Sequence, residues 1–306
     1  MRRQASWPLS MTTLSTHDTK RGEDVRARLA VLSEVPETWA ELLSQLRSIA
    51  SSGDGSFDTL MWQAIVGSWP ASPERLHAYA TKAAREAGQA TGWWDPDEAF
   101  EERVHAMVDA AFGPAQQLVD AFVAGVAGAG WSNSLAAKLL QLAGPGIPDV
   151  YQGSELWETS LVDPDNRRPV DFALRTAMLA ELDAGSLPAV DASGAAKMLV
   201  TSRCLRLRRD RPDLFTRYTP MTVVGEAAGH AIAFDRGGAL AVATRLPVGL
   251  ERRGGWGAAE LLRHVGPVVD VFTGRRFDGA RIRLGELLQA YPVALLVTDP
   301  DAEGET

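Results

Sequence analysis

The sequence predicts an α/β region followed by an all-β region, and three observations support this. A short apolar run at 8–14 leads into a polar turn at 15–22 and then into a helix-like run at 23–33, which is a strand–turn–helix unit. A long tract of helical periodicity follows. After Pro212 the helical spacing gives way to short apolar runs separated by glycine-rich turns, which is typical of an antiparallel β region.

Helical segments occupy most of the chain between the first unit and Pro212. Pro36 and Pro73 suit a first helical position, and the Asp95–Glu98 stretch suits a helix start. The apolar stripes of these segments predict core-facing sides. The expected helices begin after Pro36, at Ser72 and at Asp95, include Leu118 to Val126, run from Ser134 to Leu142, and resume at about 171–184 and 193–209.

Short strands are expected in two places. Residues 147–153 form a short buried strand and a turn, after the helix stop Gly144-Pro145-Gly146. The all-β region contains six expected strands, at 221–224, 231–234, 239–244, 268–272, 281–284 and 293–297. Residues 299–306 are expected to form a frayed tail.

Composition limits the classes of partner. The chain has 306 residues, 45% of them hydrophobic, a net charge of −8 and a pI of about 5.2. An acidic chain without a long basic block is a poor binder of nucleic acid or of an anionic membrane, so we expect neither partner. We interpret the cluster of Arg203, Arg206, Arg208, Arg209 and Arg211 as a solvated helix face.

Cysteine usage and hydropathy indicate a reducing compartment. Cys204 is the single cysteine, which excludes an internal disulfide and a cysteine-rich zinc site, and we expect it to be an inert core thiol. No apolar segment suited to a signal peptide or a membrane span is present. We therefore expect a cytoplasmic protein, with no metal site and no cofactor.

The polar turn at 15–22 contains the residue pair His17-Asp18. Taken alone, Asp18 is a helix cap and His17 is a turn residue. Lys20 and Arg21 follow directly. They are either ordinary surface charges paired with Glu23 or Asp24, or cations that keep a neighbouring carboxylate ionised.

The wider context favours a catalytic turn. The stretch Ser15-Thr16-His17-Asp18-Thr19-Lys20-Arg21-Gly22-Glu23-Asp24 resembles the fourth signature region of the α-amylase superfamily, in the form used by maltooligosyltrehalose synthases. The resemblance implies that Asp18 is the third catalytic carboxylate, which grips hydroxyls of the sugar in subsite −1 and stabilises the oxocarbenium-like transition state. It implies that His17 binds the same sugar, and that Lys20 and Arg21 contact the glucose at the reducing end.

A second segment resembles the eighth barrel strand of that superfamily. Residues 144–155 match a recurring Gly-x-Pro-x-x-Tyr-x-Gly-x-Glu pattern, and residues 156–172 resemble the maltooligosyltrehalose synthase sequence itself. The resemblance implies substrate contacts from Tyr151, Gln152 and Glu155. Four polar residues of the continuation can bond to sugar hydroxyls, or to one another in a self-satisfied turn network, and both readings stay open. They are Asp163, Asp165, Asn166 and Arg168.

A third segment, residues 91–101, resembles a Thr-Ser-Trp-x-x-Pro segment of the same family, with Gly92 in place of the usual serine. Trp93 is then a sugar platform or, alternatively, a hydrophobic staple at the start of the next helix. The nine tryptophans of the chain raise the odds of a carbohydrate ligand, although tryptophans also fill cores.

The resemblance covers only the C-terminal part of such an enzyme. The first three superfamily signatures, which carry the nucleophilic Asp and the general-acid Glu, are not found in this sequence; the nearest match, Arg208-Arg209-Asp210, lies at a charged helix end. Retaining chemistry needs two carboxylates about 5 Å apart. Two strands also cannot close an eight-stranded barrel. We therefore expect the chain to be inactive alone and to need the missing N-terminal barrel portion.

The expected architecture is the last two βα units of a (β/α)8 barrel with a large helical insertion, followed by a C-terminal antiparallel β-sandwich. The expected segments are a barrel segment at 1–34, the insertion at 35–130, a second barrel segment at 131–212 and the sandwich at 213–306. The implied reaction converts the reducing-end α-1,4 bond of a maltooligosaccharide into an α,α-1,1 bond. The alternatives are another glucan hydrolase or transferase of the superfamily, and a non-catalytic glucan-binding fragment.

Overall fold

A computed structural model describes residues 1–263 and 266–298. The chain forms two compact units. The first, which we call the helical unit, comprises residues 15–130 and 158–169; the second, the mixed unit, comprises residues 1–14, 131–157 and those from 170 onwards. The expected division of the chain into four segments, with boundaries at residues 34, 130 and 212, stays a prediction. The expected frayed tail at 299–306 lies outside the described residues.

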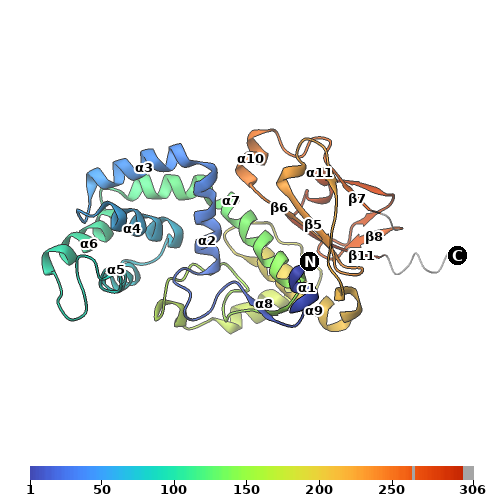
Figure 1. Ribbon diagram of the computed structural model, residues 1–306, viewed down its shortest axis with the longest axis horizontal. Coiled ribbons are helices and arrows are strands. Elements are labelled where there is room, and N and C mark those ends of the chain that lie inside the picture. The colour runs from blue at the N-terminus through green and yellow to red at the C-terminus, as the bar shows by residue number, and fades with distance from the viewer. Residues whose placement is uncertain (264–265, 299–306) are drawn as a thin grey trace. The chain divides into compact units, whose positions relative to one another are not determined.

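The helical unit is built almost entirely from helices around one core. Figure 1 shows α3, α4, α5 and α6 gathered together, and the core holds the fully buried Met61, Trp62, Leu76 and Met107. Burying such side chains stabilises the fold by roughly 1.5–3 kcal/mol each. The helices are α2 (Glu23–Ala30), the 3₁₀ turn η1 (Val31–Glu34), α3 (Pro36–Ile49), α4 (Gly55–Ser68), α5 (Pro73–Ala87), α6 (Glu98–Ala111) and the first part of α7 (Gln116–Ala143).

The helix starts in the structure carry prolines and capping residues that favour them. Pro36 and Pro73 occupy first-turn positions of α3 and α5, where a missing N–H costs nothing. The Asp97 carboxylate caps α6 by accepting a hydrogen bond from the Phe100 amide at 2.9 Å. Asp54 caps α4 in the same way, through the amides of Ser56 and Phe57.

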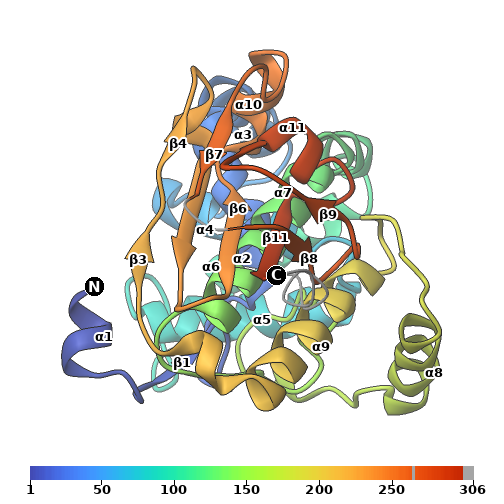
Figure 2. The ribbon, with the colours of Figure 1, turned by 90° about the vertical axis from the view of Figure 1, so that its right-hand side faces the viewer.

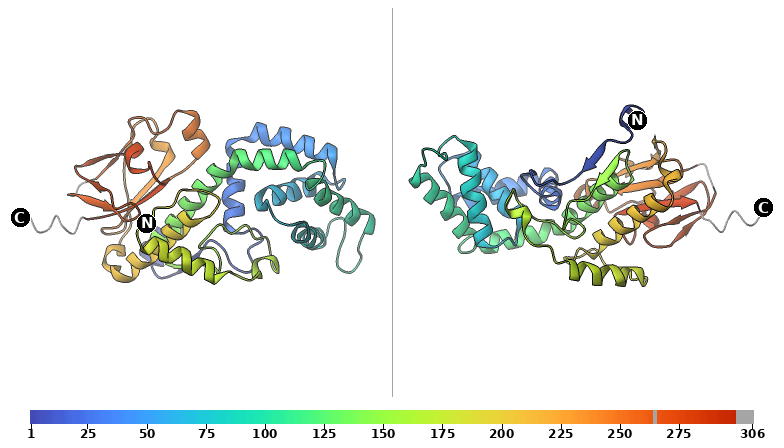
Figure 3. Two further views of the ribbon diagram at one scale, coloured as in Figure 1. Left: turned by 180° about the vertical axis from the view of Figure 1, so that it is seen from behind. Right: turned by 90° about the horizontal axis from the view of Figure 1, so that it is seen from below.

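Two helical expectations need correction. Residues 118–126 and 134–142 are expected as separate helices, but they belong to the single 28-residue helix α7, the long green helix of Figure 3. Its glycines and alanines blur the apolar stripe without ending the helix. The sequence also gives no expectation for α4, because most of its side chains are buried and no polar face marks its period.

The mixed unit contains a short parallel pair of strands. β1 (Met11–Thr13) pairs with β2 (Ile147–Asp149) in the register Met11 to Ile147. The Ile147 amide donates to the Ser10 carbonyl at 3.0 Å. Gly146 has φ +118°, and a Cβ there would lie 2.7 Å from that carbonyl, so only glycine admits this approach. Of the run expected as a strand at 8–14, only the three residues of β1 form a strand.

Helices of the mixed unit pack with two antiparallel sheets. Its helical elements are α1 (Arg2–Ser6), the end of α7, α8 (Phe172–Asp183), α9 (Ala195–Asp210), α10 (Pro247–Arg252) and α11 (Leu284–Leu287), with 3₁₀ turns at Pro212–Phe215 and Ala228–His230. The 3₁₀ turn at Asp165–Arg167 belongs to the helical unit. One sheet has the strand order β3-β5-β6-β11-β8-β9, and its central strands can be followed in Figure 2. The other has the order β10-β7-β4.

The strands have these bounds: β3 Thr219–Pro220, β4 Val223–Val224, β5 Ala231–Asp235, β6 Leu240–Thr244, β7 Glu260–Leu262, β8 Val268–Asp270, β9 Arg276–Phe277, β10 Arg281–Arg283 and β11 Val293–Thr298. Each of the six expected runs contains a strand or part of one. β3, β7 and β9 are missed because two- and three-residue strands give too few alternations to detect.

Both faces of the larger sheet are covered. Val293 and Leu295 of β11 belong to a core shared with α9, whereas Ala294 and Leu296 belong to a core shared with the smaller sheet. This alternation follows from the two-residue period of a strand. Because each face of β11 packs against a core, its sequence is a continuous apolar run and does not alternate between apolar and polar residues.

The arginine cluster on α9 is not simply a solvated face, and this expectation is corrected in part. Arg203 donates to the Val271 carbonyl at 2.9 Å. Arg208 donates to the carbonyls of Leu142 at 2.9 Å and Gly146 at 2.7 Å. Guanidinium groups here satisfy the carbonyls that the end of α7 leaves without helical partners.

Cys204 lies on the core-facing side of α9 and is buried, which confirms the expected core thiol. Burial, together with the charge of Asp270, raises the pKa of the Cys204 thiol, so the reactive thiolate is disfavoured. In the part of the chain that the structure describes, no helix combines the length and the apolar character that a membrane span requires.

Candidate functional site

The turn that carries His17 and Asp18 is tied to the start of α2. The Ser15 hydroxyl is buried and accepts a hydrogen bond from the Glu23 amide at 3.0 Å. The Thr16 amide donates to the Thr19 hydroxyl at 2.8 Å, which closes the turn. We call residues 15–22 the Asp18 turn.

The side chains of His17 and Asp18 project from this turn into solvent. They are 51% and 89% exposed, and His17 Nε2 lies 3.6 Å from Asp18 Oδ1. Gly22, and not Asp18, occupies the cap position of α2. The helix-cap reading of Asp18 is therefore wrong, and the carboxylate is accessible to a ligand.

A second segment, the 158–169 loop, holds the Asp18 turn through backbone contacts. The Gly22 amide donates to the Ser160 carbonyl at 2.8 Å, and Arg21 and Leu161 form an isolated antiparallel bridge. Asn166 Nδ2 donates to the His17 carbonyl at 2.7 Å. The loop thus binds the backbone of the turn and leaves the His17 and Asp18 side chains outward.

The start of the loop is held by α2. The Asp24 carboxylate accepts a hydrogen bond from the Glu158 amide at 2.5 Å. A negative group in the first turn of a helix is also favoured by the helix dipole. Asp24 therefore holds the loop. Lys20 and Arg21 pair with other residues, in contrast to the pairing with Asp24 that the sequence suggested.

Within the loop, Asp165 is the most engaged of the predicted site residues. Arg75 of α5 donates to both of its carboxylate oxygens, at 2.6 and 2.8 Å, and the Leu161 amide donates to it at 2.7 Å. Arg168 adds an ion pair at 3.3 Å. These contacts match the alternative in which Asp165 belongs to a hydrogen-bonded turn network. A direct contact between Asp165 and a sugar stays a prediction.

The charge of Asp165 is secured by these partners. Burial alone would raise the pKa of Asp165, but the hydrogen bonds from Arg75 and the Leu161 amide, with the charges of Arg75 and Arg168, hold that pKa below its usual value. Asp163 forms an ion pair with Arg167, and its carbonyl accepts a hydrogen bond from Lys82.

Two neighbouring cavities of the helical unit are lined by five of the twelve predicted site residues. One, of about 780 Å³, is lined in part by Lys20 and Arg21. The other, of about 280 Å³, is lined in part by Asp163, Asp165 and Arg168. Two residues, Tyr79 and Val162, line both cavities.

Lys20 and Arg21 each have a partner in the larger cavity. Lys20 Nζ lies 3.2 Å from a carboxylate oxygen of Glu86. Arg21 donates to the Gln63 side chain at 3.3 Å and to the Leu60 carbonyl at 3.0 Å. Both cations therefore sit against the wall formed by α4 and α5, and the expected pairing with Glu23 or Asp24 is not what the structure shows.

Trp93 lies on the segment before α6 and is 56% exposed. The Arg85 guanidinium carbon lies 5.2 Å from the centre of its ring, a cation–π geometry. A ring this exposed does not staple a helix start, so that alternative is wrong. Its role as a sugar platform stays a prediction.

The remaining predicted residues belong to the mixed unit. Tyr151 and Glu155 are half-buried and Gln152 is exposed. Glu155 pairs with Arg175 of α8 at 3.2 Å, and Arg175 also donates to the Gly153 carbonyl at 2.8 Å. These contacts stabilise the turn after β2, which presents Gln152 to solvent.

Sequence reasoning missed the contribution of α5. Arg75, Tyr79 and Lys82 line the cavities, and their spacing places them on one side of that helix. Tyr79 is buried, and burial raises the pKa of its hydroxyl although Arg21 acts in the opposite direction. The only sequence signal was the mixture of basic and aromatic residues along α5, which is also found on ordinary amphipathic helices.

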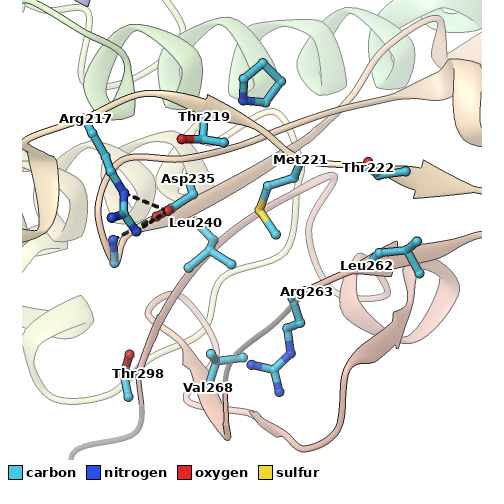
Figure 4. Close-up of a pocket in the computed structure, with 12 residues that line it drawn as sticks. Arg217, Thr219, Met221, Thr222, Asp235, Leu240, Leu262, Arg263, Val268 and Thr298 are labelled. Atoms are coloured by element: carbon cyan, nitrogen blue, oxygen red, sulfur yellow. Dashed lines mark hydrogen bonds and ion pairs between the residues drawn. The ribbon is translucent and has the colours of Figure 1, made fainter.

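The mixed unit has cavities of its own. Glu155 lines one of about 270 Å³. None of the predicted site residues lines another, of about 480 Å³. Figure 4 shows Met221, Leu240 and Leu262 on its apolar wall. Arg217 and Asp235, which also line it, form an ion pair with 3.0 Å between nitrogen and oxygen.

Comparison with known proteins gives a consistent result. No family model matches the chain. A Mycobacterium tuberculosis protein that bears the name maltooligosyl trehalose synthase is 45% identical over 304 residues, which is 96% of this chain and 38% of the relative. The solved maltooligosyltrehalose synthase of Arthrobacter ramosus is 55% identical with a TM-score of 0.95, over 97% of this chain and 40% of that one.

A glycosyltrehalose synthase of strain DSM5389 is 30% identical, with a TM-score of 0.83 over 97% of this chain and 39% of that one. In sequence and in fold the chain is thus similar to synthases named for maltooligosyltrehalose and glycosyltrehalose. The chain is homologous to the maltooligosyltrehalose synthases along nearly its whole length. It spans about two fifths of the length of these relatives.

Proposed function

We propose that the chain supplies the C-terminal part of a maltooligosyltrehalose synthase, an intramolecular transglucosylase. The substrate is a maltooligosaccharide, and the reaction converts its reducing-end α-1,4 bond into an α,α-1,1 bond. The observation that carries this proposal is the Asp18 turn, in which the backbone is held by the 158–169 loop while the carboxylate faces solvent.

In the proposed mechanism Asp18 supports the reaction without attacking the sugar. Its charge stabilises the positive charge that develops on the ring of the glucose undergoing transfer, and its oxygens accept hydrogen bonds from hydroxyls of that sugar. His17 binds the same sugar. The nucleophilic Asp and the general-acid Glu come from the portion of the enzyme that this sequence does not contain.

β1 and β2 have features of barrel strands. β1 and β2 pair in parallel, as barrel strands do, and the first polar turn after β1 carries His17 and Asp18. Met11 is 72% and Ile147 49% exposed, so the expectation that the strand at 147–153 is buried is wrong for this chain. Such exposure fits barrel strands whose neighbours come from elsewhere. We propose that the two strands are the last of a (β/α)8 barrel and that the two antiparallel sheets form a C-terminal sandwich.

Lys20 and Arg21 are proposed to hold the glucose released at the reducing end. That glucose must turn over before the new bond forms, while water is kept out. The larger cavity of the helical unit has both cations in its wall, with apolar surface from Phe57, Leu60 and Tyr79. Such a mixture suits a sugar, which presents hydroxyls at its rim and C–H groups on its faces.

The test compares products with and without the missing portion. The chain alone is expected to leave maltopentaose unchanged, because it lacks a nucleophile and an acid. After the N-terminal portion is restored, reducing sugar should fall and trehalose-terminated product should appear. A rise in reducing sugar would identify a hydrolase and contradict the proposal, and so would product formation by the chain alone at a rate set by its concentration.

A further inference from the structure

We infer that Arg75 is a positioning residue for the Asp18 turn, acting through Asp165 and the 158–169 loop. The inference rests on the proposed function for its catalytic consequence. Its structural part concerns contacts within the helical unit alone. It assigns to the helical insertion a role in holding the reacting turn, beyond that of enclosing a sugar.

The first step is the contact between α5 and the loop. Arg75 lies in the first turn of α5, and its guanidinium meets the carboxylate of Asp165 with two parallel hydrogen bonds of 2.6 and 2.8 Å. The same Nη2 donates to the Thr159 carbonyl at 3.1 Å. One side chain therefore joins both arms of the loop, which fixes its width.

The second step is that the Arg75–Asp165 pair is both shielded and restricted in orientation. The two side chains are only 18% and 10% exposed, so the pair is shielded from water. A two-pronged arginine–carboxylate pair also restricts orientation more than a single-point contact does. Lysine has one charged nitrogen and cannot reproduce both bonds in the same geometry.

The third step leads from Asp165 to the Asp18 turn by two routes. In the first, Asp165 accepts a hydrogen bond from the Leu161 amide at 2.7 Å, and Leu161 forms the backbone bridge with Arg21. In the second, the adjacent residue Asn166 donates to the His17 carbonyl at 2.7 Å. Releasing Asp165 loosens both ends of the turn together.

The consequence for the reaction is geometric. A supporting carboxylate acts only if it lies where positive charge develops, and a displacement of about 1 Å in such a group can lower turnover up to a hundredfold. Arg75 lines the smaller cavity, whereas Lys20 and Arg21 line the larger one. Because the contacts of Arg75 lead to the Asp18 turn, whose proposed role is in the transition state, we expect loss of Arg75 to affect turnover more than substrate binding.

The structural test uses the chain as it exists, with hydrogen exchange of individual amides. In Arg75→Gln, the amides of Gly22 and Leu161 should exchange about tenfold faster or more, while amides in the middle of α4 keep their rates. Asp165→Asn, which keeps the shape of the side chain, should give the same pattern. It also tests the inference if Arg75→Gln folds poorly.

Arg85→Gln is the matched control. Arg85 lies on the same helix and makes an equally two-pronged pair with Glu101 of α6, at 2.8 Å for both bonds, away from the loop. It should leave exchange at Gly22 and Leu161 unchanged. If Arg75→Gln and Arg85→Gln alter these amides equally, or if neither does, the positioning role is wrong.

The catalytic consequence is tested in the enzyme with its N-terminal portion restored. Arg75→Gln should lower kcat about ten- to a hundredfold with a much smaller change in KM, and Arg75→Lys should recover part of the loss. Faster exchange with an unchanged kcat would overturn the inference. The exchange result stands whether or not the restored enzyme forms trehalose, so a failure of the proposed function is recognised separately.

Discussion

Asn166 donates a hydrogen bond from its side-chain amide to the His17 carbonyl, with 2.7 Å between nitrogen and oxygen. The two residues are 149 positions apart in the sequence. The bond uses the backbone of His17 and leaves its ring, and the neighbouring Asp18 carboxylate, outward. A structural residue of the loop thus fixes a turn whose side chains remain available for a ligand.

Replacing Asn166 with alanine should loosen the Asp18 turn. The His17 carbonyl loses a neutral donor, and the cost to the free energy of unfolding should be about 1 kcal/mol. Thermal or denaturant unfolding of the chain measures it. Asn166→Asp is the informative companion, because it keeps the shape but lacks the N–H groups; stability equal to that of the wild type in both variants would show that the bond contributes nothing.

Gly22 should not tolerate even a methyl group. A Cβ at Gly22 would lie 2.9 Å from the Ser160 carbonyl oxygen and 3.0 Å from that of Glu158, so backbone must move. Gly22→Ala is therefore expected to destabilise the chain by roughly 1–3 kcal/mol, as overpacking does.

Gly92→Ala provides the control for this substitution. A Cβ at Gly92 meets nothing within 4 Å, and the residue does not need a left-handed backbone. Its effect on the unfolding midpoint should be slight. Equal losses in Gly22→Ala and Gly92→Ala would argue against close packing between the Asp18 turn and the 158–169 loop.

Acid should weaken the contact between α5 and α6 through Glu101. Hydrogen bonds from Arg85 lower the pKa of Glu101 from 4.5 to about 2, although burial acts against them. Because the folded state holds the carboxylate ionised, this contribution to stability is present above pH 4.5 and is lost as the pH falls toward 2. Denaturant unfolding at several pH values measures it.

Glu101→Gln separates this contribution from the others that acid affects. The variant should be less stable than the wild type at pH 7, and the difference should shrink as the pH falls from 4.5 toward 2. A difference that stays constant over this range would show that the charge of Glu101 does not stabilise the fold.

Several helices could be predicted because their signals are local. The prolines of α3 and α5 and the Asp97 cap of α6 mark helix starts through backbone chemistry that depends on neighbours in sequence alone. α4 could not be predicted in this way. Its Phe57, Met61 and Trp62 are buried together with residues on its other sides, so the amphipathic period is absent.

The site was predictable only where its residues lie in one short motif. His17 and Asp18 are adjacent, and their context in the sequence indicated a catalytic turn, a role that stays a prediction. The partner of Asp165 could not be foreseen, because Arg75 is 90 residues away and a lone arginine in a helical segment carries no mark of its contacts. The same holds for Lys20 and Glu86, which only the packing of α5 brings together.

Asp18→Asn, in the enzyme with its N-terminal portion restored, tests most directly whether Asp18 is a transition-state carboxylate. The substitution keeps the shape and removes the charge. Turnover of a maltooligosaccharide should fall roughly a hundredfold or more, because a preorganised electrostatic contact is lost, while the Michaelis constant changes far less. Turnover within about twofold of the wild type would contradict the account, because such a result assigns no catalytic role to the charge of Asp18.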